Sequence, residues 1–221
     1  MVFYAVAPIG RIYKWMKDEQ GIDVGAVSMF NEPNLSGVNH DSMNPSAGQA
    51  ADIFASVGSY LQRHVAADGD VQMPLLVGPD GSGTGASINY LRALLNNPDA
   101  AGFLDVAGSH YYGGAAADWA TLHDQAAPRQ LWQTEWANLN NADDGIDNGL
   151  EAVTKVHQVF AGGGNAFVYF QWAVQGTDAS QGNGLIRIQP DGYVVPIGQR
   201  VTRARGPVHQ PRAGRGLTVA G

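Results

Sequence analysis

Two glutamates of this chain each follow a short run of residues that is typical of a β-strand. Glu32 follows the run 24–29, and Glu135 follows the run 130–134. Because the carboxyl ends of parallel strands converge at one end of an α/β sheet, we expect the two side chains to meet there. Two carboxyl groups brought together in this way can supply an acid/base and a nucleophile, the pair of groups that cleaves a glycosidic bond.

The residues beside both glutamates suit the recognition of a sugar. Asn31 precedes Glu32 and can both donate and accept hydrogen bonds, while Pro33 ends the strand and disfavours a helix at Glu32. Trp132 and Trp136 flank Glu135 and offer flat apolar faces, which raise a neighbouring carboxyl pKa and stack on sugar rings. A solvent-exposed turn and a packing tryptophan are the structural alternatives.

Two further strand ends carry polar or aromatic side chains. His110 and Tyr112 follow the run 103–107, and a tyrosine hydroxyl there could hold a carboxylate ionised by hydrogen bonding. Trp172 follows the run 166–171, where an indole could form the floor of a sugar subsite. For His110 and Trp172, the residues around them support a purely structural role as well as a role in binding sugar.

Composition excludes several classes of protein. The 221 residues are 44% hydrophobic, which suits a globular domain with a sizeable core. The formal net charge of −7 disfavours binding to a nucleic-acid backbone, and no apolar run approaches the roughly 20 residues that span a bilayer. The first residues lack the basic segment of a secretion signal.

The sequence predicts no metal site and no cofactor. There is no cysteine, no HExxH motif and no close cluster of histidine and aspartate. The GxSxG pattern of serine hydrolases is also absent. A nucleotide-binding α/β domain is an alternative from another class, and the absence of a phosphate-binding loop disfavours it.

Helix-like and strand-like segments alternate along the chain, which predicts a parallel sheet with crossover helices. We expect helices at 9–20, 47–66, 88–96, 119–125 and 149–160, and strands at 24–29, 74–77, 103–107, 130–134 and 166–171. An eight-stranded barrel takes about 250 residues. The sequence therefore predicts an α/β fold of the (β/α)8 barrel type, truncated to about strands 4–8, and a doubly wound open sheet is the alternative.

The C-terminal segment differs from the rest of the chain. Five of the 13 lysines and arginines lie between Arg200 and Arg215, in a stretch rich in glycine, proline and alanine and without a hydrophobic period. We expect residues 1–198 to form the partial catalytic barrel and residues 199–221 to form an irregular, disordered tail.

The order of these motifs resembles the retaining clan A glycoside hydrolases. The motifs are Asn31-Glu32-Pro33, His110-Tyr111-Tyr112, Thr134-Glu135-Trp136 and Trp172. Within the clan, the stretches 76–81, 90–98 and 110–114 are most similar to glycoside hydrolase family 30. Family 39 is the rival, because 31–35 and 134–136 also resemble its motifs. The resemblance covers about residues 9–198, and the segment 200–221 resembles nothing in family 30.

The resemblance implies specific roles for these residues. Glu32 would be the acid/base after barrel strand four, and Glu135 would be the nucleophile after strand seven. Substrate contacts would come from Asn31, His110, Tyr112, Trp136 and Trp172.

The resemblance also implies an activity. The reaction would be double displacement at β-glycosidic bonds of a plant or microbial polysaccharide such as xylan, β-1,6-glucan or β-1,6-galactan. The protein would be secreted, would need no cofactor, and would have an oligo- or polysaccharide as its partner rather than nucleic acid or a membrane. Because the first three strands of the barrel are missing, an inactive carbohydrate-binding remnant of such an enzyme is the alternative.

Overall fold

The computed structural model describes residues 3–36, 43–64, 72–138, 146–171, 173–175, 186–188 and 194–196. The chain divides into two compact units, each with its own sheet. The first unit comprises Met1–Ala137 and Ala152–Phe170, and the second comprises Asn138–Glu151 and Gln171–Gly221. None of the described helices is both long enough and apolar enough to cross a membrane.

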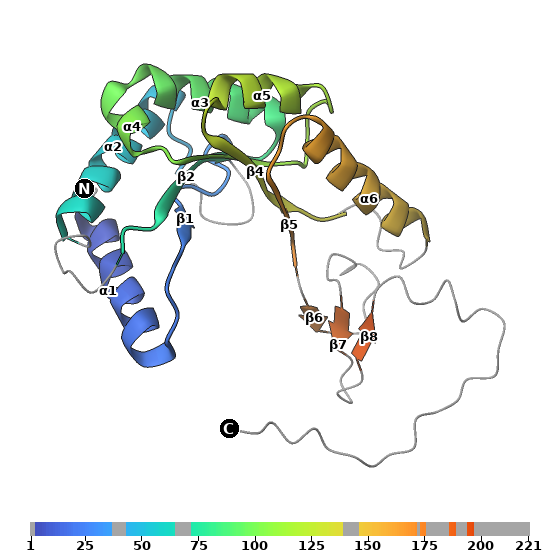
Figure 1. The fold of residues 1–221 in the computed structure, drawn as a ribbon, viewed down its shortest axis with the longest axis horizontal. Coiled ribbons are helices and arrows are strands. Elements are labelled where there is room, and N and C mark those ends of the chain that lie inside the picture. The colour runs from blue at the N-terminus through green and yellow to red at the C-terminus, as the bar shows by residue number, and fades with distance from the viewer. Residues whose placement is uncertain are drawn as a thin grey trace, which may run out of the picture. The chain divides into compact units, whose positions relative to one another are not determined.

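The first unit is built on a five-stranded parallel sheet whose strands lie in chain order, β1-β2-β3-β4-β5 (Figure 1). Its strands are β1 (Ala26–Ser28), β2 (Leu75–Gly81), β3 (Val106–His110), β4 (Gln130–Trp136) and β5 (Ala166–Tyr169). A doubly wound sheet reverses its strand order at a switch point, and this sheet does not. Successive parallel strands in chain order are the arrangement of a (β/α)8 barrel, so the predicted fold class is confirmed.

Crossover helices connect these strands, and Figure 1 shows α2 to α5 on one face of the sheet. The helices are α1 (Phe3–Gln20), α2 (Ala47–His64), α3 (Thr84–Asn96), α4 (Pro98–Phe103), α5 (Asp118–Ala126) and α6 (Ile146–Ala161). The core lies between helices and sheet, where Phe54 and Leu61 of α2 and Leu91 and Leu94 of α3 are completely buried. This layer fixes the strands on which the site depends.

Local signals explain where two of these helices begin. At the start of α2, the Gln49 N–H donates to Ser46 Oγ at 3.3 Å and the Ser46 N–H donates to Gln49 Oε1 at 2.9 Å, which is a reciprocal capping box. At the start of α4, the Asn97 side chain accepts hydrogen bonds from two backbone N–H groups, and Pro98 occupies the first helical position.

The predicted elements agree with the structure in order but not in every boundary. All five predicted helices and all five predicted strands are present. The helix α4 was not predicted, and it takes up Phe103, so the strand expected at 103–107 begins only at Val106. Strand β2 runs on to Gly81, four residues beyond its expected end at residue 77.

The second unit holds a small three-stranded sheet in the order β6-β7-β8. Strand β6 (Ala173–Gln175) pairs in parallel with β7 (Ile186–Ile188), which pairs antiparallel with β8 (Val194–Pro196). Trp172 and the expected tail at 199–221 lie outside the described residues.

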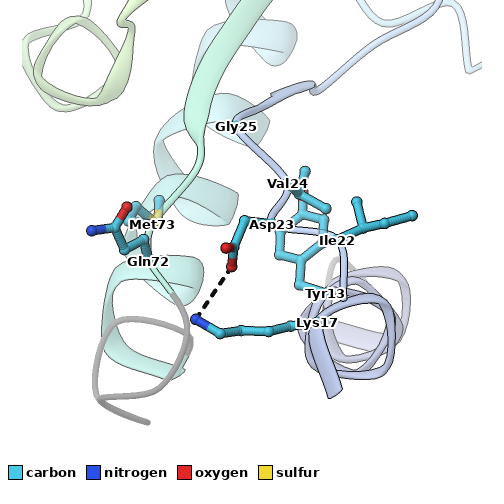
Figure 2. Close-up of a pocket in the computed structure, with 8 residues that line it drawn as sticks. All are labelled: Tyr13, Lys17, Ile22, Asp23, Val24, Gly25, Gln72 and Met73. Carbon is cyan, nitrogen blue, oxygen red and sulfur yellow. Dashed lines mark ion pairs between the residues drawn. The ribbon is translucent and has the colours of Figure 1, made fainter. Parts of the chain in front are cut away.

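A cavity of about 90 Å³ lies at the amino-terminal end of the first sheet (Figure 2). The segments 22–25 and 72–73, which lead into β1 and β2, line it together with Tyr13 and Lys17 of α1. Lys17 Nζ lies 3.2 Å from Asp23 Oδ1. The Tyr13 hydroxyl is buried without a hydrogen-bond partner among the described residues, and burial raises its pKa to about 12.

Candidate active site

Irregular strand pairing turns side chains toward a second cavity, at the carboxyl-terminal end of the same sheet. Asp80 in β2 and Thr134 in β4 are each an extra residue opposite β3, so each marks a β-bulge. The cavity has a volume of about 310 Å³. Among the residues that line it are Ser28, Asn31, Asp80, His110, Trp132, Thr134 and Glu135.

The loop that carries Glu32 is fixed by hydrogen bonds to neighbouring strand ends. The Glu32 N–H donates to the Asp80 carbonyl at 2.9 Å, and Asn34 exchanges two hydrogen bonds with Ser82. The Tyr90 hydroxyl bonds the carbonyl of Pro33 at 3.3 Å. Glu32 itself has a φ of 48°, a left-handed conformation that a glutamate rarely adopts. Such strained residues cluster at functional sites.

His110 lies between the two glutamates. Its Nδ1 is 3.0 Å from Glu32 Oε1, and its Nε2 is 3.9 Å from Glu135 Oε2. The imidazole is buried, with 3% of the side chain exposed, whereas Glu32 is 12% and Glu135 is 26% exposed. An oxygen of each glutamate and a ring nitrogen of His110 lie within 4.8 Å of one another. The sequence prediction that the two carboxyl groups would meet therefore agrees with their positions.

Tyr112 contacts the second of these carboxylates. Its hydroxyl donates to Glu135 Oε1 at 3.0 Å. Burial, together with the negative charge of Glu135, raises the pKa of Tyr112 well above its ordinary value, so the phenol keeps its proton. The hydrogen bond therefore orients the carboxyl group of Glu135.

The two tryptophans beside Glu135 lie in different surroundings. Trp132 lines the cavity, so it offers an aromatic face to a bound sugar. Trp136 is 3% exposed and packs edge-to-face against Phe167 and Tyr169 of β5. The structure therefore does not bring Trp136 to the cavity, although the sequence predicted a substrate contact for it. The bulge at Thr134 is the reason, because it breaks the alternation of faces along β4.

Three polar residues of the cavity were not among the predicted site residues. Thr134 Oγ1 donates to Asp80 Oδ1 at 2.6 Å, and Ser28 Oγ is hydrogen-bonded to Asp80 Oδ2. Asp80 is 2% exposed and has a φ of 52°. A turn-forming Pro-Asp-Gly sequence at 79–81 was the only local signal, and it indicates a turn rather than a buried carboxyl group.

The cluster of Glu32, His110 and Glu135 could also offer ligand atoms to a metal ion. However, Glu32 contacts Nδ1 of the ring and Glu135 faces Nε2. An ion bound to one ring nitrogen would lie on the side of only one glutamate. The geometry suits a histidine held between two carboxylates better than a three-ligand centre, and we assign no metal to it.

Solved structures of glycoside hydrolases share this fold. The catalytic domain of the family 30 xylanase C from Talaromyces cellulolyticus is 22% identical, with a TM-score of 0.66 over 86% of this chain and 42% of that one. A family 30 endoxylanase from Clostridium papyrosolvens C71 is 20% identical, with a TM-score of 0.61 over 82% of this chain and 43% of that one. An endo-β-1,6-glucanase is 16% identical, with a TM-score of 0.65 over 90% and 47%.

The chain spans less than half the length of each of these proteins. No protein-family model matches it, and no curated protein matches it in sequence. At these identities the likeness shows the fold, and the expected similarity to family 30 is confirmed at that level. The chain has the fold of the family 30 glycoside hydrolases, in the form of a partial (β/α)8 barrel.

Proposed function

We propose that this chain carries the catalytic centre of a retaining glycoside hydrolase that acts on β-glycosidic bonds. The observation that carries the proposal is the convergence of Glu32 and Glu135 on His110, with one oxygen of each within 4.8 Å of the other. Retaining enzymes separate their two carboxyl groups by about 5–5.5 Å, and inverting enzymes by about 6.5–9.5 Å to admit a water. The short separation supports direct attack by a carboxylate.

In the first step, Glu135 attacks the anomeric carbon and Glu32 donates its proton to the departing glycosidic oxygen. The bond between sugar and leaving group breaks as an ester bond between sugar and Glu135 forms. Support for this assignment comes from Tyr112, whose hydroxyl donates to Glu135 and orients its carboxyl group.

In the second step, Glu32 acts as a base. It removes a proton from water, the water oxygen attacks the anomeric carbon, and the ester bond to Glu135 breaks. Because the configuration inverts twice, the product keeps the β configuration. His110 contacts Glu32 directly and orients its carboxyl group for both proton transfers.

The residues around the cavity support a neutral saccharide as substrate. Asn31 and Trp132 line the cavity and offer an amide for hydroxyl groups and an indole face for a sugar ring. No lysine or arginine is among the described residues that line it, so nothing there would pair with a uronic acid. The candidates are xylan, β-1,6-glucan and β-1,6-galactan, and the structural neighbours include two xylanases and an endo-β-1,6-glucanase. Such polysaccharides are too large to enter a cell, so we propose that the protein is secreted.

Turnover and chemical rescue test the proposal. The full chain is incubated with each of the three polysaccharides, and reducing sugar is measured. Glu32→Ala and Glu135→Ala are then assayed on an aryl β-glycoside with and without azide. In Glu32→Ala the first step needs little acid on such a substrate, and azide should restore turnover as a β-glycosyl azide. In Glu135→Ala azide should give the α-product.

Glu19→Ala is the matched control, because Glu19 is exposed near the end of α1 and should leave turnover unchanged. Identical responses of the Glu32 and Glu135 variants to azide would contradict the assigned roles. Binding of a polysaccharide without any release of reducing sugar would instead favour a carbohydrate-binding remnant.

A further inference from the structure

The hydroxyl group of Ser28 has two partners but only one proton. Its Oγ lies 2.9 Å from the Phe30 carbonyl oxygen, which can only accept a hydrogen bond. The same Oγ is hydrogen-bonded to Asp80 Oδ2. If Ser28 donates to Phe30, the proton in the second bond has to come from Asp80.

The other oxygen of Asp80 is an acceptor. Thr134 Oγ1 lies 2.6 Å from Asp80 Oδ1 and supplies its proton to that bond. A protonated Asp80 therefore satisfies every hydrogen bond of the group: Thr134 donates to Oδ1, Oδ2–H donates to Ser28, and Ser28 donates to Phe30. An ionised Asp80 would compete with the Phe30 carbonyl for the single proton of Ser28.

The surroundings of Asp80 favour the neutral form. The residue is 2% exposed, and no lysine or arginine is among the described residues that line the cavity. Burial raises the pKa of the Asp80 carboxyl above its ordinary value, against the hydrogen bonds from Ser28 and Thr134 and the charge of His110, which lower it. Two other titratable groups lie on neighbouring elements: Glu32, which follows β1, and Glu135, near the end of β4. Both are acidic, so neither supplies a positive charge to Asp80.

We propose that Asp80 is a neutral carboxylic acid in the folded chain and acts as the positioning residue that holds the loop bearing Glu32. Three bonds connect it to the site. Its side chain reaches the Phe30 carbonyl through Ser28, its main-chain carbonyl accepts the Glu32 N–H at 2.9 Å, and its Oδ1 binds Thr134, the residue before Glu135. The proposed protonation state does not depend on the proposed function, whereas the positioning role rests on it.

Infrared spectroscopy tests the protonation state without any assay of activity. The difference between wild type and Asp80→Asn at about pH 7 should contain the C=O band of a protonated carboxyl group, because an ordinary aspartate is ionised there. Ser28→Ala retains Asp80 and removes its acceptor, so it should shift the same band. This second variant keeps the test decisive if Asp80→Asn does not fold. A difference spectrum without the band would overturn the proposal.

Thermal unfolding gives an independent readout. A folded-state pKa above the unfolded value gives stability that is complete at low pH and is lost as pH rises through the folded value. An amide cannot ionise but can still donate to Ser28 and accept from Thr134. Asp80→Asn should therefore unfold about 3 °C or more above wild type at about pH 8, with the difference shrinking toward pH 4. Asp124→Asn, which removes an exposed carboxylate of α5, should show no such trend.

Activity tests the positioning role. Asp80→Leu removes every side-chain hydrogen bond of the group and should lower kcat about 100-fold while changing KM by less than about 3-fold, as expected when a reacting group is misplaced. Asp80→Asn should recover at least about 10-fold of that loss. Equal losses in both variants would overturn the positioning role. An inactive wild type would count against the proposed function and leave the infrared and unfolding results to decide the state of Asp80.

Discussion

The two ends of the first sheet each hold a cavity, and their polar groups are paired differently. At the carboxyl-terminal end, Glu32, His110, Glu135 and Tyr112 form a connected, mostly buried network. At the amino-terminal end, Lys17 and Asp23 form an ion pair with 36% and 78% of their side chains exposed. The Tyr13 hydroxyl beside them has no partner among the described residues.

The difference follows from the polarity of parallel strands. Strand ends at the carboxyl side lead into loops that can bring side chains from several strands together, which is why barrels build active sites there. The opposite end contributes to stability. We therefore expect substitutions at the carboxyl-terminal end to change turnover and those at the amino-terminal end to change only the free energy of unfolding.

The largest expected effect separates two tyrosines, one at each end. Tyr112→Phe removes the hydrogen bond to Glu135 and should lower kcat by about 10- to 100-fold, since a hydrogen bond to a charged group is worth about 1.5–3 kcal/mol. Tyr13→Phe should leave kcat unchanged. Steady-state kinetics on an aryl β-glycoside measures both, and an equal loss in the two variants would remove the distinction between the ends.

Two glycines, one in β3 and one before β1, allow a comparison of how tightly the chain is packed around each. A Cβ on Gly108 would overlap Asp80 Oδ1 and lie 2.7 Å from Val77 Cγ1, so Gly108→Ala should destabilise the fold by about 1–3 kcal/mol. Gly25, before β1, has nothing within 4 Å of such a Cβ, and Gly25→Ala should change stability little. Urea unfolding monitored by circular dichroism measures both. An unchanged free energy of unfolding for Gly108→Ala would mean that Asp80 and Val77 are not tightly packed against Gly108.

Titration of Tyr13 sharpens the contrast at the amino-terminal end. Because burial raises its pKa to about 12, the corresponding stability is complete below the unfolded value near 10 and is lost as pH rises toward 12. Tyr13→Phe should raise the free energy of unfolding by roughly 1 kcal/mol at neutral pH, since the buried hydroxyl lacks a partner. The gain should widen above about pH 10. A stability profile that is identical to wild type through this range would place Tyr13 in contact with water.

The smallest effect concerns the exposed ion pair. Lys17→Met should change the free energy of unfolding by less than about 1 kcal/mol, because water and salt screen such pairs. Added salt should reduce even this difference. A loss of stability that persists in high salt would show that the ion pair contributes more to the free energy of unfolding than its exposure predicts.

The sequence was a good guide to the fold and to the meeting of the two glutamates. Alternating helix and strand patterns predict a parallel sheet, and two acids at the carboxyl ends of its strands have to share one end. Glu32 follows β1 and Glu135 lies near the end of β4, and both side chains reach His110 at the end of β3.

The sequence was a poor guide to the finer composition of the site. Trp136 faces away from the cavity because of the bulge at Thr134, which depends on pairing with β3 and leaves no local pattern. The left-handed backbone of Asp80 is likewise set by distant contacts. The missed helix α4 is different, because Asn97 and Pro98 form a start signal that the sequence displays.

The bulge at Thr134 also sets how this site tolerates changes in chain length. A strand alternates its faces with a period of two, and Thr134 is the extra residue that interrupts this alternation. Deletion of Thr134 would place Glu135 directly after Gln133, so Glu135 would still face the cavity and Trp136 would still face away from it. The deletion would instead remove the hydrogen bond from Thr134 Oγ1 to Asp80 Oδ1. This strand end can therefore lose one codon and keep its acid in place, at the expense of the contact that connects β4 to β2.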